Sequence, residues 1–164
     1  KFLVLHGGVA DPMSAWLCQR GMRTMGLRIR QQMQNAEVLA AALEKDSRIK
    51  KVLHPSLASH PQHELVKKMY QNGCVTAMMS IEVEPDREKI NAFMRKLNVV
   101  NYAMTLGGLR TTIAHPCTSS HYGLPQEFLD DIGITYGLIR VSVGLENVED
   151  LIADFKQALD VFES

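Results

Sequence analysis

Residues 138–146 constrain the fold of this chain most, because they form its strongest predicted strand. Alternation along the strand puts Ile139, Val141 and Val143 on one face, which β-branched side chains fill. The other face carries Arg140 between apolar neighbours. A guanidinium keeps its charge, so it needs a carboxylate, a phosphate or solvent, and its fork suits a planar carboxylate best. The strand alone leaves two interpretations open, an ion pair with a protein Asp or Glu and a carboxylate ligand.

Composition narrows the class of protein. The 164 residues are 46% hydrophobic, enough to bury a proper core. Lys plus Arg and Asp plus Glu both number 18, so the net charge of +0 disfavours a nucleic-acid or membrane partner. No apolar run approaches the ~18–20 residues of a membrane span. The cysteines, Cys18, Cys74 and Cys117, are an odd number at wide spacing, which predicts a reducing, cytoplasmic location.

Helical and extended patterns alternate along the chain. Asp11 and Pro12 predict the start of a helical region that runs to Leu43 as two helices or one bent helix, since Gly21 and Gly26 interrupt it. Further helices are predicted at 64–70, 87–97, 125–131 and 148–162, and extended segments at 50–53, 74–84, 99–105 and 111–114. This order predicts an α/β fold in which helices cover one face of a mostly antiparallel sheet.

Two other groups of residues could carry chemistry. His54, His60 and His63 suggest a metal site, but two prolines separate them and no cysteine or carboxylate completes the set, so we expect a structured loop and no metal. Cys117 and His121 could form a nucleophile pair, although a free cysteine in a polar loop is usually inert. The loop 105–108 and Arg140 remain the stronger candidates, because small residues let a ligand approach the backbone.

Several segments, in order, resemble the C-terminal part of one enzyme family. They are residues 7–12, 20–25, 27–28, 35–36, 54–63, 105–108, 115–116 and 139–146. The family is the pyridoxal-phosphate enzymes of cysteine and methionine metabolism: cystathionine γ-synthase, cystathionine γ-lyase, cystathionine β-lyase and methionine γ-lyase. The resemblance covers essentially the whole chain. It implies the small C-terminal domain of fold-type I enzymes at 46–164, with 1–45 as the end of the large cofactor-binding domain and its linking helices.

The resemblance also assigns roles to residues of the candidate site. Arg140 takes the position of the arginine that holds the substrate α-carboxylate, and Thr105 and Leu106 fall beside the bound amino acid. Met104 lies where the residue type varies with substrate preference; a glutamate there could accept a hydrogen bond from a distal amino group, and methionine cannot. Two departures are Thr105 in place of Ser and Arg110 in place of Glu.

The implied cofactor is pyridoxal 5'-phosphate, bound mainly by residues upstream of this segment. The Schiff-base lysine is expected there too, because Lys1 does not match its motif, so this segment alone should be inactive. We expect a homotetramer that eliminates or replaces groups at the γ or β carbon of small sulfur amino acids. Which of the member reactions it performs stays open. The alternative is a non-catalytic interaction or regulatory domain on the same fold.

Overall fold

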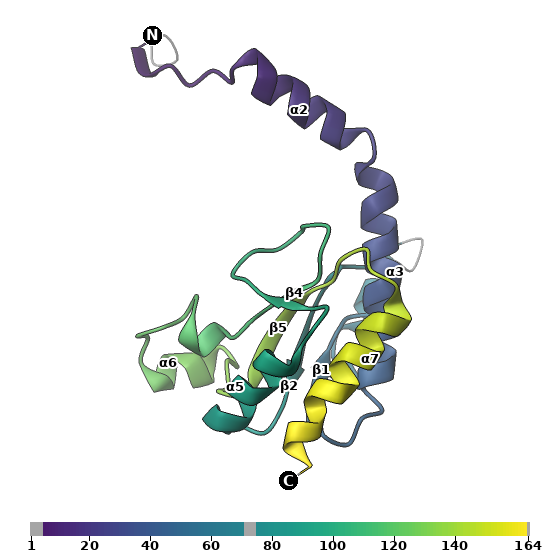
Figure 1. Ribbon diagram of the computed structural model, residues 1–164, viewed down its shortest axis with the longest axis vertical. Helices are drawn as coiled ribbons and strands as arrows, with labels where there is room; N and C mark the ends of the chain where they lie inside the picture. The colour runs from purple at the N-terminus through teal and green to yellow at the C-terminus, as the bar shows by residue number, and fades with distance from the viewer. Residues whose placement is uncertain (1–4, 71–74, 164) are drawn as a thin grey trace.

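The computed structural model describes residues 5–70 and 75–163, which form a mixed five-stranded sheet with helices packed on it (Figure 1). The strand order is β1-β2-β5-β4-β3, and every neighbouring pair is antiparallel except β3 with β4. The strands are β1 Lys51–Leu53, β2 Met78–Glu82, β3 Asn101–Tyr102, β4 Thr112–Ala114 and β5 Leu138–Ser142. The predicted α/β fold with a mostly antiparallel sheet is therefore confirmed.

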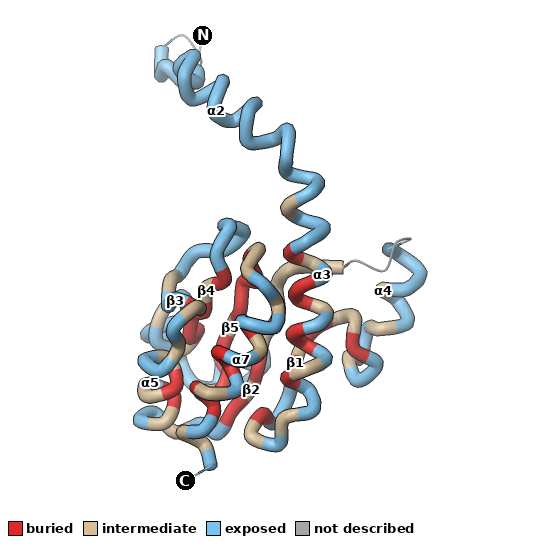
Figure 2. Tube along the Cα trace, turned by 45° about the vertical axis from the view of Figure 1, so that its right-hand side comes forward, coloured by how far each residue is buried: buried red, intermediate tan, exposed pale blue. Residues whose placement is uncertain are grey.

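Three helices supply the layer that covers the sheet. They are α3, α5 and α7, and their buried residues share one core cluster with the strands. The helices are α2 Pro12–Met22, α3 Met25–Leu43, α4 His63–Met69, α5 Arg87–Lys96, α6 Gln126–Asp131 and α7 Val148–Leu159, with 3-10 turns η1 Pro116–Thr118 and η2 Asp160–Phe162. Helix α2 has no buried residue and projects away from the sheet (Figure 2). The domain boundary near residue 45 stays a prediction.

The core lies between the helices and the predicted apolar face of β5. Ile139, Val141 and Val143 are fully buried there, as the alternation predicts. Phe93 of α5 and Phe155 of α7 close the core with their ring centroids 6.1 Å apart. Fully burying side chains of this size stabilises the fold by about 1.5–3 kcal/mol each. Arg140, on the other face of β5, is not part of this core.

Side-chain caps start three of the helices. Asp11, Asp86 and Asn147 accept hydrogen bonds from backbone N–H groups in the first turns of α2, α5 and α7. Such caps satisfy N–H groups that have no partner inside a helix. The long helical region is two helices that join at residues 23–24, near Gly21 and Gly26.

The run 99–105 is less extended than its sequence predicts. Only Asn101 and Tyr102 pair as a strand. The preceding N–H groups of Asn98, Val99 and Val100 donate to the carboxylate of Asp154, which is 5% exposed, at 2.9–3.0 Å. A side chain of α7 thus takes the donors that a longer strand would have used. The expected strand 74–84 is likewise shorter, and its first residue lies outside the described residues.

Two further properties concern the described residues as a whole. None of their helices is long and apolar enough to cross a membrane. No three of their His, Cys, Asp or Glu side chains gather in a group that could hold a metal ion.

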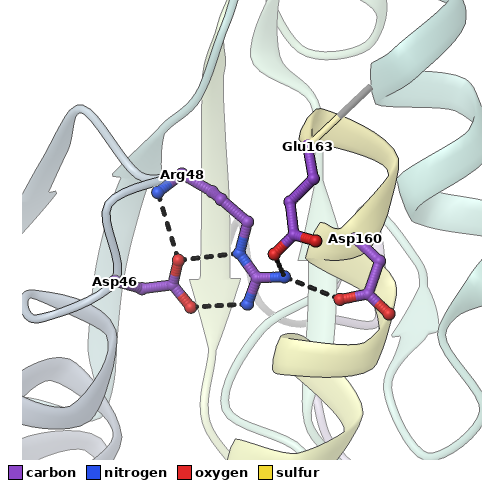
Figure 3. A network of polar contacts seen from close by, with 4 residues as sticks. All are labelled: Asp46, Arg48, Asp160 and Glu163. Carbon is purple, nitrogen blue, oxygen red and sulfur yellow. Dashed lines mark hydrogen bonds and ion pairs between the residues drawn. The ribbon is translucent and has the colours of Figure 1, made fainter.

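Arg48 joins the loop after α3 to the end of the chain (Figure 3). Its Nε and Nη2 donate to the two carboxylate oxygens of Asp46 at 2.8 and 2.7 Å, and its Nη1 reaches Asp160 at 2.6 Å and Glu163 at 2.9 Å. The side chains of Arg48 and Asp46 are only 14% and 9% exposed. The hydrogen bonds from Arg48 therefore hold the pKa of Asp46 below its ordinary value of 3.8.

Replacing Arg48 by Met should lower the free energy of unfolding at pH 7 by about 2–3 kcal/mol, because it leaves the Asp46 carboxylate shielded and unpaired. The ion pair of Asp46 stabilises the fold at pH values above the ordinary carboxyl pKa, and this stabilisation is lost as the pH falls through the lowered pKa of the folded state. The free energy of unfolding of the variant should therefore depend less on pH in the acid range. Urea denaturation from pH 3 to 7 measures both effects. Lys67→Met, which removes an exposed pair with Glu64, should change stability by less than about 0.5 kcal/mol. Equal stability and pH profiles for parent and Arg48→Met would contradict the assignment.

Candidate functional site

Arg140 lies at the middle of β5, opposite Ser80 of β2 and Ala114 of β4. Its Nη2 donates to the backbone carbonyl of Thr105 at 3.1 Å. Among residues 5–70 and 75–163 it forms no ion pair with a carboxylate. Its Nε is buried and has no hydrogen-bond partner within those residues. The described residues therefore do not supply the ion pair within the fold that was the first interpretation of Arg140.

Arg140 lines an open depression of about 420 Å³ on the face of the sheet opposite the helices. Met78 and Ser80 of β2 also line it, together with Pro55 and His60. The described lining contains no lysine and no carboxylate. The depression thus offers one cation with free N–H groups, which is suited to an anionic ligand.

The loop 104–108 borders Arg140 and is exposed. Met104 and Leu106 are 65% and 59% exposed, so the structure brings all four candidate residues, Met104, Thr105, Leu106 and Arg140, to one place. The Thr105 carbonyl also accepts a hydrogen bond from Thr112 Oγ1 at 3.2 Å. Gly107 has φ +73°, a conformation that favours glycine, and its N–H donates to Ser142 Oγ at 3.0 Å.

Strand β5 ends at Ser142 because the chain then turns to pack against the far end of this loop. Leu145 N–H donates to the Leu109 carbonyl at 2.9 Å. A Cβ on Gly144 would lie 2.5 Å from that same carbonyl oxygen, so only glycine permits this approach. Sequence reasoning treated residues 143–146 as part of the strand and missed this role.

The two buried histidines act in the structure as hydrogen-bonded core residues. His54 Nε2 donates to the Thr76 carbonyl at 3.1 Å, while Ser56 N–H donates to its Nδ1 at 3.3 Å, which identifies the neutral form. Burial lowers the pKa of His54 below its ordinary value of 6.5. His115 Nε2 lies 2.6 Å from the Tyr136 carbonyl oxygen, and its Nδ1 lies 2.8 Å from the hydroxyl oxygen of Thr118. Both residues precede a proline just after a strand, a signal for this arrangement that sequence reasoning did not use.

Cys117 and His121 do not form a nucleophile pair. The Cys117 thiol lies 3.4 Å from the Thr135 carbonyl, and His121 Nδ1 contacts Ser120 Oγ at 2.8 Å. Burial raises the pKa of the Cys117 thiol above its ordinary value of 9.0. A protonated thiol with no base beside it is a poor nucleophile.

Comparisons with known proteins identify the family. The family model described as Cys/Met metabolism PLP-dependent enzyme matches residues 1–160. The chain belongs to this family. It is 40% identical over 154 residues to a cystathionine beta-lyase of Lactococcus lactis subsp. cremoris, covering 94% of this chain and 40% of the relative. An L-methionine gamma-lyase of Fusobacterium nucleatum subsp. polymorphum is 38% identical over 156 residues, covering 95% of this chain and 39% of the relative.

Solved structures agree with this assignment. The cystathionine gamma synthase of Xanthomonas oryzae pv. oryzae, solved in complex with aminoacrylate and cysteine, superposes with a TM-score of 0.87 at 34% identity. The match covers 97% of this chain and 41% of that structure. The chain therefore spans about 40% of the length of these relatives. It has the small-domain architecture of fold-type I pyridoxal-phosphate enzymes.

The described residues of the Arg140 depression fit one part of the chemistry of this family. Its enzymes depend on pyridoxal phosphate. No described lining residue offers the amine that links covalently to an aldehyde cofactor, and the unpaired guanidinium is instead suited to the carboxylate of an amino acid. The chemistry of the described lining is therefore that of a site for an anionic group.

The Cys117 thiol should be unreactive at neutral pH. With Cys18 and Cys74 replaced by Ser, so that Cys117 is the only thiol of these 164 residues, the rate of its alkylation by iodoacetamide should rise with a midpoint above pH 9, because burial favours the neutral form. A midpoint near pH 7 would instead restore Cys117 as a candidate nucleophile.

Proposed function

We propose that this chain supplies the substrate-carboxylate site of a pyridoxal-phosphate enzyme that eliminates or replaces groups at the γ or β carbon of sulfur amino acids. The observation that carries the proposal is Arg140, a strand arginine that faces an open depression and has no carboxylate partner among the described residues. Membership of the family supports the cofactor, and the substrates named for its relatives support the substrate class.

Arg140 would bind and orient the substrate. Its guanidinium can donate two parallel hydrogen bonds to the α-carboxylate, which fixes the plane of that group as well as its position. The Thr105 carbonyl holds one side of the guanidinium, so the fork is already oriented before a ligand binds. Bound pyridoxal phosphate supplies the electron sink for a carbanion at the α carbon. A fixed carboxylate leaves the α C–H bond in one orientation for the base that removes its proton.

Met104 and Leu106 would contact the rest of the amino acid. Both side chains are exposed on the loop beside Arg140 and are apolar. They offer dispersion contact to a thioether and no acceptor for a distal amino group. This arrangement supports a sulfur-containing side chain as the occupant.

We also propose that α2 is buried in the complete enzyme, as part of a homotetramer. Its exposed apolar side chains include Met13, Trp16, Leu17 and Met22, which are 52–63% exposed. Apolar surface of this extent is typical of a contact with another part of the protein or another subunit. A segment with these 164 residues alone is proposed to be inactive, because the resemblance places the Schiff-base lysine upstream of it and Lys1 does not match the motif of that lysine.

Arg140→Ala in the full-length holoenzyme should lower kcat/KM for a sulfur amino acid by roughly ten- to hundredfold or more, since each charge-assisted hydrogen bond contributes about 1.5–3 kcal/mol. Arg140→Lys should lower it less, because one charge remains but the fork is lost. Cofactor absorbance should match the parent in both variants.

Arg95, an exposed arginine near the end of α5, provides the matched control, and Arg95→Ala should stay within about twofold of the parent. If Arg140→Ala also stays within twofold, Arg140 is a structural residue and the proposed carboxylate site is wrong. A colourless full-length protein that does not bind pyridoxal phosphate would favour the non-catalytic alternative.

Burial of α2 should appear in the oligomeric state. Sedimentation of the complete enzyme at micromolar concentration should show a tetramer, and Leu17→Glu should weaken it because the helix would then carry a charge into an apolar contact. A stable monomer of the parent protein would contradict the proposed assembly.

A further inference from the structure

We infer that Glu146 is a positioning residue for the carboxylate site, acting on Arg140 through the loop 105–112. The inference rests on the proposed function, in which Arg140 binds the substrate carboxylate. It concerns a residue that is not among those lining the Arg140 depression.

Both carboxylate oxygens of Glu146 accept hydrogen bonds from the same residue, Thr111. Oε1 accepts from Thr111 N–H at 2.6 Å, and Oε2 accepts from Thr111 Oγ1 at 2.8 Å. Thr111 is fully buried, and its Oγ1 also accepts from Gly144 N–H at 2.9 Å. Two hydrogen bonds to one carboxylate, plus a third to the hydroxyl, fix the backbone of Thr111 in position and orientation.

Helix α3 holds the other side of this arrangement. Asn35, which is 3% exposed, donates through Nδ2 to the carbonyls of Gly144 at 3.1 Å and Glu146 at 2.8 Å. Gln32, one helical turn earlier, donates to the Gly108 carbonyl at 2.6 Å. The segment that carries Glu146 and the loop that carries Gly108 are therefore both tied to one rigid helix.

The path from Glu146 to Arg140 is short. Thr111 is followed directly by Thr112, whose Oγ1 donates to the Thr105 carbonyl at 3.2 Å. The same carbonyl accepts the only hydrogen bond described for the guanidinium of Arg140, at 3.1 Å. A shift of Thr111 would thus move the one group that orients the arginine fork. Because Nε has no partner, no second described contact would hold the fork in place.

A purely structural role for Glu146 makes a different prediction from a positioning role. A structural residue would lower the activity toward all substrates together. A residue that orients Arg140 toward a carboxylate would lower activity selectively for substrates that carry that carboxylate. The ratio of kcat/KM for a sulfur amino acid to kcat/KM for its methyl ester, which lacks the negative charge, separates the two roles.

The variants should be made in the full-length holoenzyme. Glu146→Gln keeps the shape of the side chain and removes its charge, and Thr111→Val keeps the shape and removes the hydroxyl. Thr111→Ser keeps both donors to Glu146, the backbone N–H and the hydroxyl, and should retain the activity of the parent. Asp154→Asn is the matched control, because Asp154 also accepts backbone N–H groups of a loop, but at residues 98–100.

We expect the acid-to-ester ratio to fall by about five- to tenfold in Glu146→Gln and Thr111→Val, the effect of one misplaced hydrogen bond. The ratio should stay within about twofold of the parent in Thr111→Ser and Asp154→Asn, even where Asp154→Asn lowers the melting temperature. In an Arg140→Ala background, Glu146→Gln should produce no further fall, because two residues on one path are not additive.

The outcomes separate the inference from the function on which it rests. If Arg140→Ala lowers the ratio and Glu146→Gln does not, the positioning role of Glu146 is overturned and the carboxylate site stands. If Arg140→Ala leaves the ratio unchanged, the proposed function itself fails. A fall of the same size in Asp154→Asn would show that the ratio reports general loss of stability, and it would also overturn the inference.

Discussion

Strand β5 is hydrogen-bonded on both sides, to β2 and to β4, and its two faces meet different surroundings. On one face, Ile139, Val141 and Val143 are packed under the helices, so the strand cannot slip by one residue without exposing all of them. That constraint also fixes Arg140 on the opposite face. The packing of the core therefore determines where the guanidinium of Arg140 lies on the other face of the sheet.

Much of the fold could be predicted from local patterns. The caps Asp11, Asp86 and Asn147 lie within three residues of the N–H groups they bind, so sequence spacing reveals them. The alternation along β5 separated its buried face from the face with Arg140, and the structure confirms that separation. The motifs of the enzyme family identified the chain more sharply than any single pattern could.

The parts that sequence reasoning missed depend on contacts between distant residues. Asp154 binds the backbone some 55 residues earlier, and this shortened the strand predicted near residue 100. Glu146 and Thr111 are 35 residues apart, and Asn35 is 109 residues from Gly144. No local rule links an acidic residue after a strand to a particular threonine. A conformation that depends on Gly144 passing close to Leu109 likewise has no signature except the glycine itself.

The sheet order also has a consequence for synthesis of the chain. Of the five described strands, β5 is made last; it lies in the middle of the sheet and alone joins the pair β1–β2 to the pair β3–β4. Until residue 142 leaves the ribosome, the inner edges of β2 and β4 have no partner strand. At about 5–20 residues per second, the nascent chain carries an open β2 edge for roughly several seconds. Unpaired edges bind other strands readily, so during this interval the β2 edge is open to pairing with other chains.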